Sequence, residues 1–155
     1  HLKTEINEIP RFGIRFALDS KFETLEYFGK GKRECYIDYQ EHAKMDLWQS
    51  TVTQEYEPYI MPQDCGNHVG VRYLSLTGEK TLTFQAEKPF EFSALHYTLE
   101  ELDRARHAFE LIPSDTTEVL ICYKNRGVGS NSCGPRLRPQ YCVTDRRIHF
   151  AFQVR

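Results

Sequence analysis

The sequence lacks the features of several large classes of protein. It has no run of 18 apolar residues, the minimum for a membrane-spanning helix, and no internal repeat or low-complexity segment. Its net charge is only −2, so its overall composition does not predict a nucleic-acid or membrane partner. These absences favour one globular domain over the 155 residues, a length that can bury a core.

The cysteines and histidines likewise lack the spacing of a metal site. The five cysteines form no CxxC pair, and the six histidines are scattered. An odd number of cysteines without a repeating pattern favours reduced thiols and therefore a cytoplasmic location. The chain starts at His1 with neither a signal nor a transit pattern, which predicts a piece of a longer protein.

Aromatic residues in alternating patterns dominate what is present. The chain contains 10 Phe, 9 Tyr and 1 Trp, and in several segments apolar residues alternate with polar ones. This alternation indicates half-buried strands of an antiparallel sheet. We expect strands within Phe12–Phe16, Phe22–Phe28, Val69–Leu76, Thr81–Ala86, Phe90–Ala94, Val119–Tyr123 and Ile148–Val154.

One helix interrupts the strand pattern. Thr98 and Glu101 form a capping box, which predicts a short helix near Leu99–Arg106. The fold class expected is therefore all-β, an antiparallel β-sandwich with one short helix. Its core should contain Phe12, Ile14, Phe16, Leu82, Phe84, Phe92, Ile121, Phe150 and Phe152.

Three loops are rich in glycine, proline, amides and charge: Gly29–Tyr39, Tyr59–Arg72 and Arg126–Tyr141. The segment Arg126–Pro139 alone holds three glycines, two prolines and two serines, a composition typical of an ordered binding loop. Polar loops on a rigid β-scaffold with aromatics nearby suit a carbohydrate. The residues by themselves predict a sugar-binding or protein-binding β-sandwich.

Other candidate sites have simpler explanations. Glu100 and Glu101 could be an acid–base pair, but their place in the first turn of a helix is explained by the helix dipole. Cys65 and His68 could form a thiol–imidazole nucleophile, but turn chemistry explains their segment better. From Lys124 onward the chain has seven Lys or Arg and one acid, a basic tail that we expect to meet the acidic remainder or solvent.

The same loops resemble one enzyme family. FGKGKRECYID at Phe28–Asp38 is similar to FGxGPxENYxD of the C-terminal domain of multi-domain β-galactosidases of glycoside hydrolase family 2. YIMPQDCGNHVGVR at Tyr59–Arg72 resembles that domain's YxxPQENGNRxxVR. FSALHY at Phe92–Tyr97, followed by Leu102, Asp103 and His107, and GVGSNSCGP at Gly127–Pro135 resemble two further motifs in the same order.

The resemblance implies a fold and a role. The chain, residues 1–155, would be the C-terminal portion of a β-supersandwich, similar in fold to galactose mutarotases. It would carry no catalytic residue, because the family's catalytic carboxylates lie in a separate (β/α)₈ barrel. The domain lends one loop to the active site, which here would place Ser130, Asn131, Ser132 and Cys133 at the substrate, with Cys133 where some members have Trp.

The resemblance also implies partners. These are the barrel and other domains of the same enzyme and a β-galactoside such as lactose, with neither nucleic acid nor membrane. The family's Mg²⁺ and Na⁺ ions bind outside the matched motifs, so no cofactor is expected in this fragment. If strands upstream are missing, an exposed sheet edge would allow a homo-oligomer.

Several positions depart from the family pattern: Lys32, Cys35, Tyr39, Asp64, Cys65 and His68. These departures bear on loop geometry and substrate range. Two alternatives remain beside the family hypothesis: a free-standing carbohydrate-binding module, and a mutarotase in which His96 and Glu34 would flank the sugar.

Overall fold

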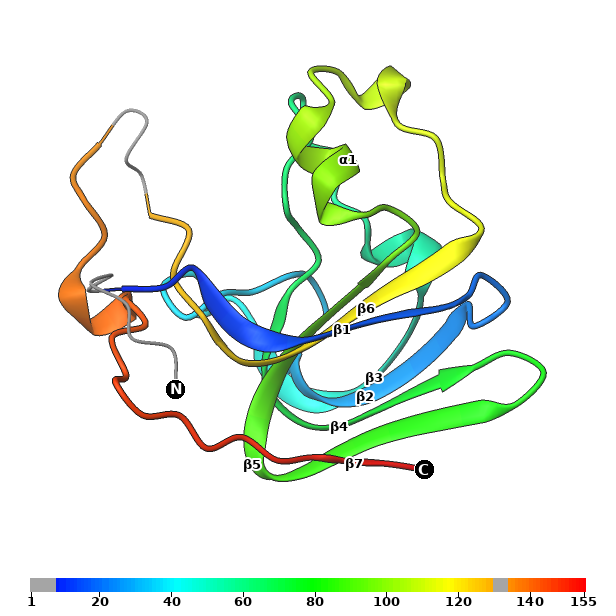
Figure 1. The fold of residues 1–155 in the computed structure, drawn as a ribbon, viewed down its shortest axis with the longest axis horizontal. Helices are drawn as coiled ribbons and strands as arrows, with labels where there is room; N and C mark the ends of the chain where they lie inside the picture. The colour runs from blue at the N-terminus through cyan, green and yellow to red at the C-terminus, as the bar shows by residue number, and fades with distance from the viewer. Residues whose placement is uncertain (1–7, 130–133) are drawn as a thin grey trace.

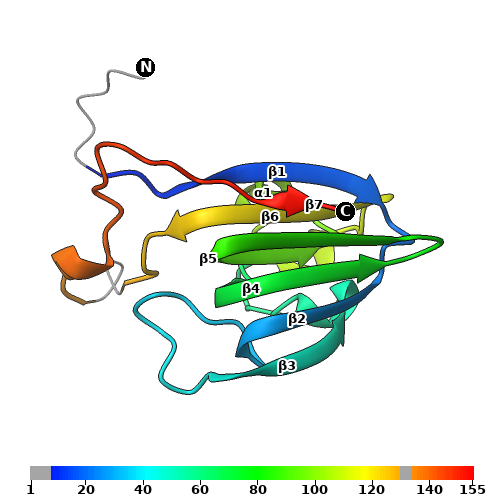
Figure 2. The same ribbon diagram turned by 90° about the horizontal axis from the view of Figure 1, so that it is seen from below.

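The computed structural model describes residues 8–129 and 134–155. Its strands form a single antiparallel sheet in the order β1-β6-β5-β4-β2-β3, with β7 paired to β5. Figure 2 shows six of these strands side by side in this order. The strands are β1 (Arg11–Asp19), β2 (Thr24–Gly31), β3 (Lys44–Thr51), β4 (His68–Thr77), β5 (Thr81–Leu95), β6 (Thr116–Asn125) and β7 (Gln153–Val154).

The helical elements are short. The helix α1 (Leu99–Arg104) lies on one side of the sheet, as Figure 1 shows. The Thr98 hydroxyl accepts the Glu101 N–H at 3.1 Å, and the Glu101 carboxylate accepts the Thr98 N–H at 2.8 Å. The capping box and the single short helix are therefore confirmed, although α1 ends two residues before Arg106. The 3₁₀ helices are η1 (Val52–Glu55), η2 (Ala108–Glu110) and η3 (Pro139–Tyr141).

The all-β antiparallel fold is confirmed, and the sheet curls over its own core. Phe16 on β1 packs against Phe84 on β5, with ring centroids 5.2 Å apart, although β6 separates these strands in the sheet. The Phe152 ring lies 6.1 Å from that of Phe16. The two layers of the sandwich are thus parts of one curved sheet, closed on one side by the C-terminal segment.

β5 corrects the expectation of two separate strands. Thr81–Ala86 and Phe90–Ala94 belong to one strand of 15 residues. Its first part pairs with β7 at Phe84 and Gln85, and its last part pairs with β6 from Glu91 onward. Pro89 falls between these two ladders, where its missing N–H removes no bond to either neighbour.

Other strand predictions need smaller corrections. The segment Ile148–Val154 forms a strand only at Gln153–Val154, and Phe150 and Phe152 pack on the core from irregular backbone. The strand β3 was not predicted. It lies at the edge of the sheet, where Met45 and Leu47 remain exposed.

The expected core is confirmed for most of its members. Phe84, Phe92 and Ile121 are fully buried, and Phe16, Leu82, Phe150 and Phe152 pack against them. Phe12 and Ile14 were predicted wrongly, since their side chains are 41% and 49% exposed. β1 is an edge strand, and from it only Phe16 and Leu18 reach the central cluster.

The core predicts a contrast between two phenylalanines. Phe84→Ala should lower the free energy of unfolding by about 3–5 kcal/mol, because it leaves a cavity at a fully buried ring. Phe109→Ala should change it by less than about 0.5 kcal/mol, because the Phe109 side chain is 84% exposed. Denaturant unfolding of both variants measures the difference, and equal effects would contradict this core.

Candidate functional site

Three of the four sequence motifs meet at one end of the sheet. β6 ends and β1 begins there, and β2 ends and β4 begins there, since the strands of each pair are antiparallel. The two pairs come together because β4 and β6 pair with different parts of the long strand β5, which overlap at Phe92. The loop after β2 and the segment after β6 leave the sheet from this end, as Figures 1 and 2 show. We call this region the junction and define it by Glu34, Cys35, Gly66, Asn67, Glu91 and Asn125.

The first two motifs are joined by hydrogen bonds at the junction. The Cys35 N–H donates to the Asn67 carbonyl at 2.7 Å, and the Asn67 amide returns a bond to the Cys35 carbonyl at 3.0 Å. The Glu34 carboxylate accepts the Gly66 N–H at 2.8 Å and also the Tyr59 hydroxyl. Glu34 and Asn67 are buried, so these bonds fix the two loops against each other.

A second set of bonds connects the loop before β4 to β5 and β6. Glu91 on β5 accepts the amide N–H groups of Asn67 at 3.0 Å and of Asn125 at 2.8 Å. Burial raises the pKa of Glu91, while the two amides and nearby Arg11 oppose that rise. Since Asn125 is the last residue of β6, this network sets where the following segment starts.

That segment is held by a side chain from the first motif. The two carboxylate oxygens of Asp38 accept the N–H groups of Val128 at 3.0 Å and Gly129 at 2.9 Å. We call residues Arg126–Gly129 the arm. Ser130, Asn131, Ser132 and Cys133, the predicted substrate-binding residues, follow the arm directly and lie outside the described residues.

His68, one of the departures from the family pattern, is buried beside the junction. Its Nε2 lies 2.5 Å from a carboxylate oxygen of Glu55, and its Nδ1 lies 3.0 Å from the Tyr27 hydroxyl. Burial alone would lower the pKa of His68, but interactions with Cys35 and Glu55 outweigh it and raise that pKa to about 9. His68 and Glu55 therefore form a buried ion pair at neutral pH.

The remaining departures divide into buried and surface positions. Cys35 and Cys65 are fully buried, whereas Lys32 and Tyr39 are exposed. Asp64 forms an ion pair with Arg11. Cys35, Cys65, Cys122 and Cys142 are all free thiols.

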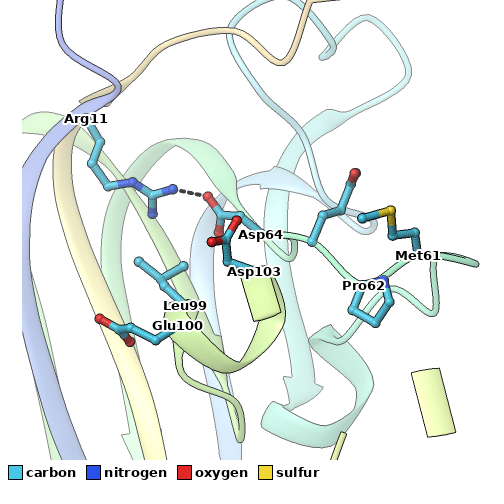
Figure 3. A pocket seen from close by; sticks show the side chains of 8 residues that line it. Arg11, Met61, Pro62, Asp64, Leu99, Glu100 and Asp103 are labelled. Carbon is cyan, nitrogen blue, oxygen red and sulfur yellow. Dashed lines mark hydrogen bonds and ion pairs between the residues drawn. The ribbon is translucent and has the colours of Figure 1, made fainter. Parts of the chain in front are cut away.

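An open cleft lies on the α1 side of the junction. It has a volume of about 590 Å³, and the Arg11–Asp64 pair stands in its wall (Figure 3). The carboxylate of Glu100, which also lines the cleft, accepts a hydrogen bond from the Arg15 guanidinium at 2.9 Å. The lining residues are Arg11, Met61, Pro62, Gln63, Asp64, Leu99, Glu100 and Asp103.

The side chains of the two alternative catalytic pairs, Glu100 with Glu101 and Cys65 with His68, have structural roles. Glu101 caps α1, and Glu100 pairs with Arg15, so the two are not an acid–base pair. Burial raises the pKa of Cys65 to about 11, which keeps its thiol protonated, and His68 is bound to Glu55.

The mutarotase pair is also separated by its hydrogen bonds. His96 Nε2 contacts the Glu23 carboxylate at 2.6 Å, while Glu34 holds Tyr59 and Gly66. His96 and Glu34 therefore face different partners.

The described part of the chain has neither a metal cluster nor a spanning helix. Within residues 8–129 and 134–155, no group of three or more His, Cys, Asp or Glu side chains is arranged to hold a metal ion. None of the helices in these ranges is long and apolar enough to cross a membrane.

Sequence reasoning missed the residues that organise the junction. Asp38 is the last residue of the first motif, but it contacts the arm about 90 residues further along the chain. No local sequence pattern indicates a contact over that separation. Glu91 and Asn125 were also missed. The sequence held no signal for Glu91, because a polar residue between Phe90 and Phe92 fits the ordinary alternation of a half-buried strand.

The ion pair predicts a loss of stability at alkaline pH. His68 has a raised pKa in the folded state, so its contribution is complete below its ordinary pKa of about 6.5 and disappears as the pH rises through about 9. Glu55→Gln should cost about 3–5 kcal/mol near neutral pH and flatten this dependence. Denaturant unfolding from about pH 6 to about pH 10 measures both effects.

Glu110→Gln is the matched control for this measurement. Its partner His107 is mostly exposed, so the stability should change little at any pH. A wild-type protein that lost no more stability than Glu55→Gln between neutral and alkaline pH would rule out the ion pair.

Comparisons with known proteins agree with the arrangement of motifs. The family model described as "Beta galactosidase small chain" matches residues 1–154. The chain is 39% identical over 151 residues to a β-galactosidase of Actinobacillus pleuropneumoniae and 35% identical over 148 residues to one of Staphylococcus xylosus. These matches cover 97% and 95% of this chain.

A β-galactosidase of Streptococcus thermophilus is 37% identical over 132 residues, or 83% of this chain. The chain spans only 13–15% of the length of these three relatives. A family match over nearly every residue shows membership, and this chain belongs to the β-galactosidase small-chain family.

Proposed function

We propose that this chain is the C-terminal part of a retaining β-galactosidase that hydrolyses terminal β-D-galactosyl residues of β-galactosides such as lactose. In this proposal the chain completes the substrate site with Ser130, Asn131, Ser132 and Cys133. The two carboxylates that such a reaction requires, about 5 Å apart, belong to a barrel elsewhere in the enzyme. A cytoplasmic setting, and Mg²⁺ and Na⁺ bound by other domains, complete the proposal.

The convergence of the motifs is the observation that carries this proposal. Three segments that resemble the family's motifs, Phe28–Asp38, Tyr59–Arg72 and the one that starts at Gly127, are scattered in sequence, yet hydrogen bonds join them at one end of the sheet. The remaining motif starts at Phe92, next to Glu91, which accepts the Asn67 amide. These bonds surround the start of the segment that contains Cys133. A rigid base under one polar loop suits a loop that must reach into a site formed with another domain.

In the proposal, Asp38 and the two carboxylates of the junction support the loop and take no part in catalysis. Glu34, Asp38 and Glu91 each accept hydrogen bonds from two groups of the neighbouring segments. Their oxygen atoms are therefore engaged with neighbouring segments of the chain. The chain would bind and orient, while proton transfer and nucleophilic attack occur on the barrel.

The surface supports further domains as partners. Phe12 and Ile14 on edge strand β1 are exposed, and so are Ile60, Met61 and Ile112 near α1. Arg136, Arg138, Arg146 and Arg147 of the basic tail are exposed as well. Apolar groups with arginines are typical of interfaces, and the other domains of the same enzyme are the proposed occupants.

The first test compares the chain alone with the whole enzyme. The pure 155-residue chain should show no turnover of an aryl galactoside, and calorimetric titration with galactose or lactose should show no binding. Circular dichroism is the control for folding. Turnover by the chain that disappears on mutating one of its own Glu or Asp residues would contradict the proposal, and sugar binding by the chain alone would favour a carbohydrate-binding module.

The second test concerns Cys133. A thiol offers a small polarisable contact but lacks the stacking face of an indole. Cys133→Trp in the full-length enzyme should change KM or the ratio of transglycosylation to hydrolysis by about threefold or more, with the melting temperature unchanged. Cys133→Ala is the matched variant. If both variants left the kinetics with lactose and an aryl galactoside unchanged, the loop would have no role at the substrate.

A further inference from the structure

Asp38 is presented by a rigid turn. Tyr36 and Tyr39 exchange two backbone hydrogen bonds, at 3.0 and 2.9 Å, so Ile37 and Asp38 lie at the tip of a tight four-residue turn. The side-chain amide of Gln40 donates to the Ile37 carbonyl at 2.7 Å, and Tyr36 is buried beneath the turn. The Asp38 carboxylate is thus fixed before it meets any other segment.

The arm fits around this carboxylate. Each oxygen of Asp38 takes one N–H, from Val128 and from Gly129, and Gly129 has a φ of +65°, which favours glycine. Gly127 approaches so closely that a Cβ atom there would lie 2.4 Å from the Asp38 Cγ. Both positions therefore require glycine: position 127 because Asp38 leaves no room for a side chain, and position 129 because of its backbone conformation.

Backbone bonds hold the rest of the arm. The Gly127 N–H donates to the Tyr141 carbonyl at 2.9 Å, and the Arg126 N–H donates to the Pro10 carbonyl at 2.8 Å. These bonds fix where the arm starts and where the chain returns after the loop. They do not hold Val128 or Gly129, whose N–H groups both go to Asp38.

We infer that Asp38 is a positioning residue: it couples the loop after β2 to the arm, from which the chain continues into the predicted substrate-binding residues. This inference rests on the proposed function, in which those residues reach the galactosyl group. Asp38 needs no contact with substrate for this role. It acts through the two amides of the arm.

A carboxylate is required by the geometry. Two N–H donors point at two oxygens, and the bonds are charge-assisted, which makes them stronger than neutral ones. Asparagine has the same shape but only one oxygen, so its NH₂ group would face one of the two N–H donors. Asp38→Asn should therefore lose one bond of the pair, and Asp38→Ala should lose both.

Hydrogen exchange of the full-length enzyme, followed by mass spectrometry, tests the coupling directly. The amides of Val128 and Gly129 should exchange roughly tenfold faster in Asp38→Ala, and Asp38→Asn should release at least one of them. Gly127→Ala should give the same result by displacing the arm. Glu41→Gln, an exposed acid in the same loop, is the control and should leave these amides unchanged.

Kinetics of the same variants test the functional part. Asp38→Asn should raise KM for an aryl galactoside about threefold to tenfold with kcat changed less than twofold, because a misplaced binding loop weakens binding more than chemistry. The Glu41→Gln enzyme should match wild type. A role confined to folding would lower the melting temperature without this separation of KM from kcat.

The outcomes separate the two proposals. Unchanged exchange at Val128 and Gly129 in Asp38→Ala would overturn the coupling, and faster exchange with unchanged KM would overturn the positioning role. A wild-type enzyme without activity on any β-galactoside would refute the proposed function, while the exchange measurement would still decide whether Asp38 holds the arm.

Discussion

The buried bonds of Glu91 are the constraint on which the rest of the junction depends. A carboxyl group inside a β-sheet is costly unless it has hydrogen-bond donors, and here the amides of Asn67 and Asn125 both donate to Oε2 of Glu91. The three side chains come from the loop before β4, from β5 and from β6. Satisfying one buried group therefore fixes where the loop before β4 ends and where the segment after β6 begins, and shifting β5 or β6 by one residue would break these bonds.

The loops are then joined to each other by hydrogen bonds and by a small buried cluster of Cys35, Ala43 and Val69. Cys35 and Asn67 exchange bonds, Glu34 holds Gly66, and Asp38 holds the arm. Each bond contributes modestly, but leaving a buried partner unsatisfied costs more than the bond gains, so the set resists partial opening. This explains how irregular loops can present a well-defined surface.

Three of the six departures from the family pattern lie in this interior. Cys35 uses its sulfur to accept the Val69 N–H at 3.4 Å, and His68 forms a buried ion pair with Glu55. Cys65 is buried against Leu95 and Leu102. These residues alter how the loops are supported, because none of the three is exposed. Their effect on substrate range would have to pass through the positions of the loops.

The sequence by itself determined the antiparallel β class, the capped helix at Leu99 and the family, because alternation, a capping box and ordered motifs are local patterns. Only the tertiary structure decided that Thr81–Leu95 is one strand that pairs with β4, β6 and β7, and that edge strand β1 leaves Phe12 exposed. It also decided that Asp38 meets Val128, Glu91 meets Asn125 and His68 meets Glu55. The first two contacts join residues far apart in the chain, and all three are set by how the curved sheet brings its loops together, which local preference does not encode.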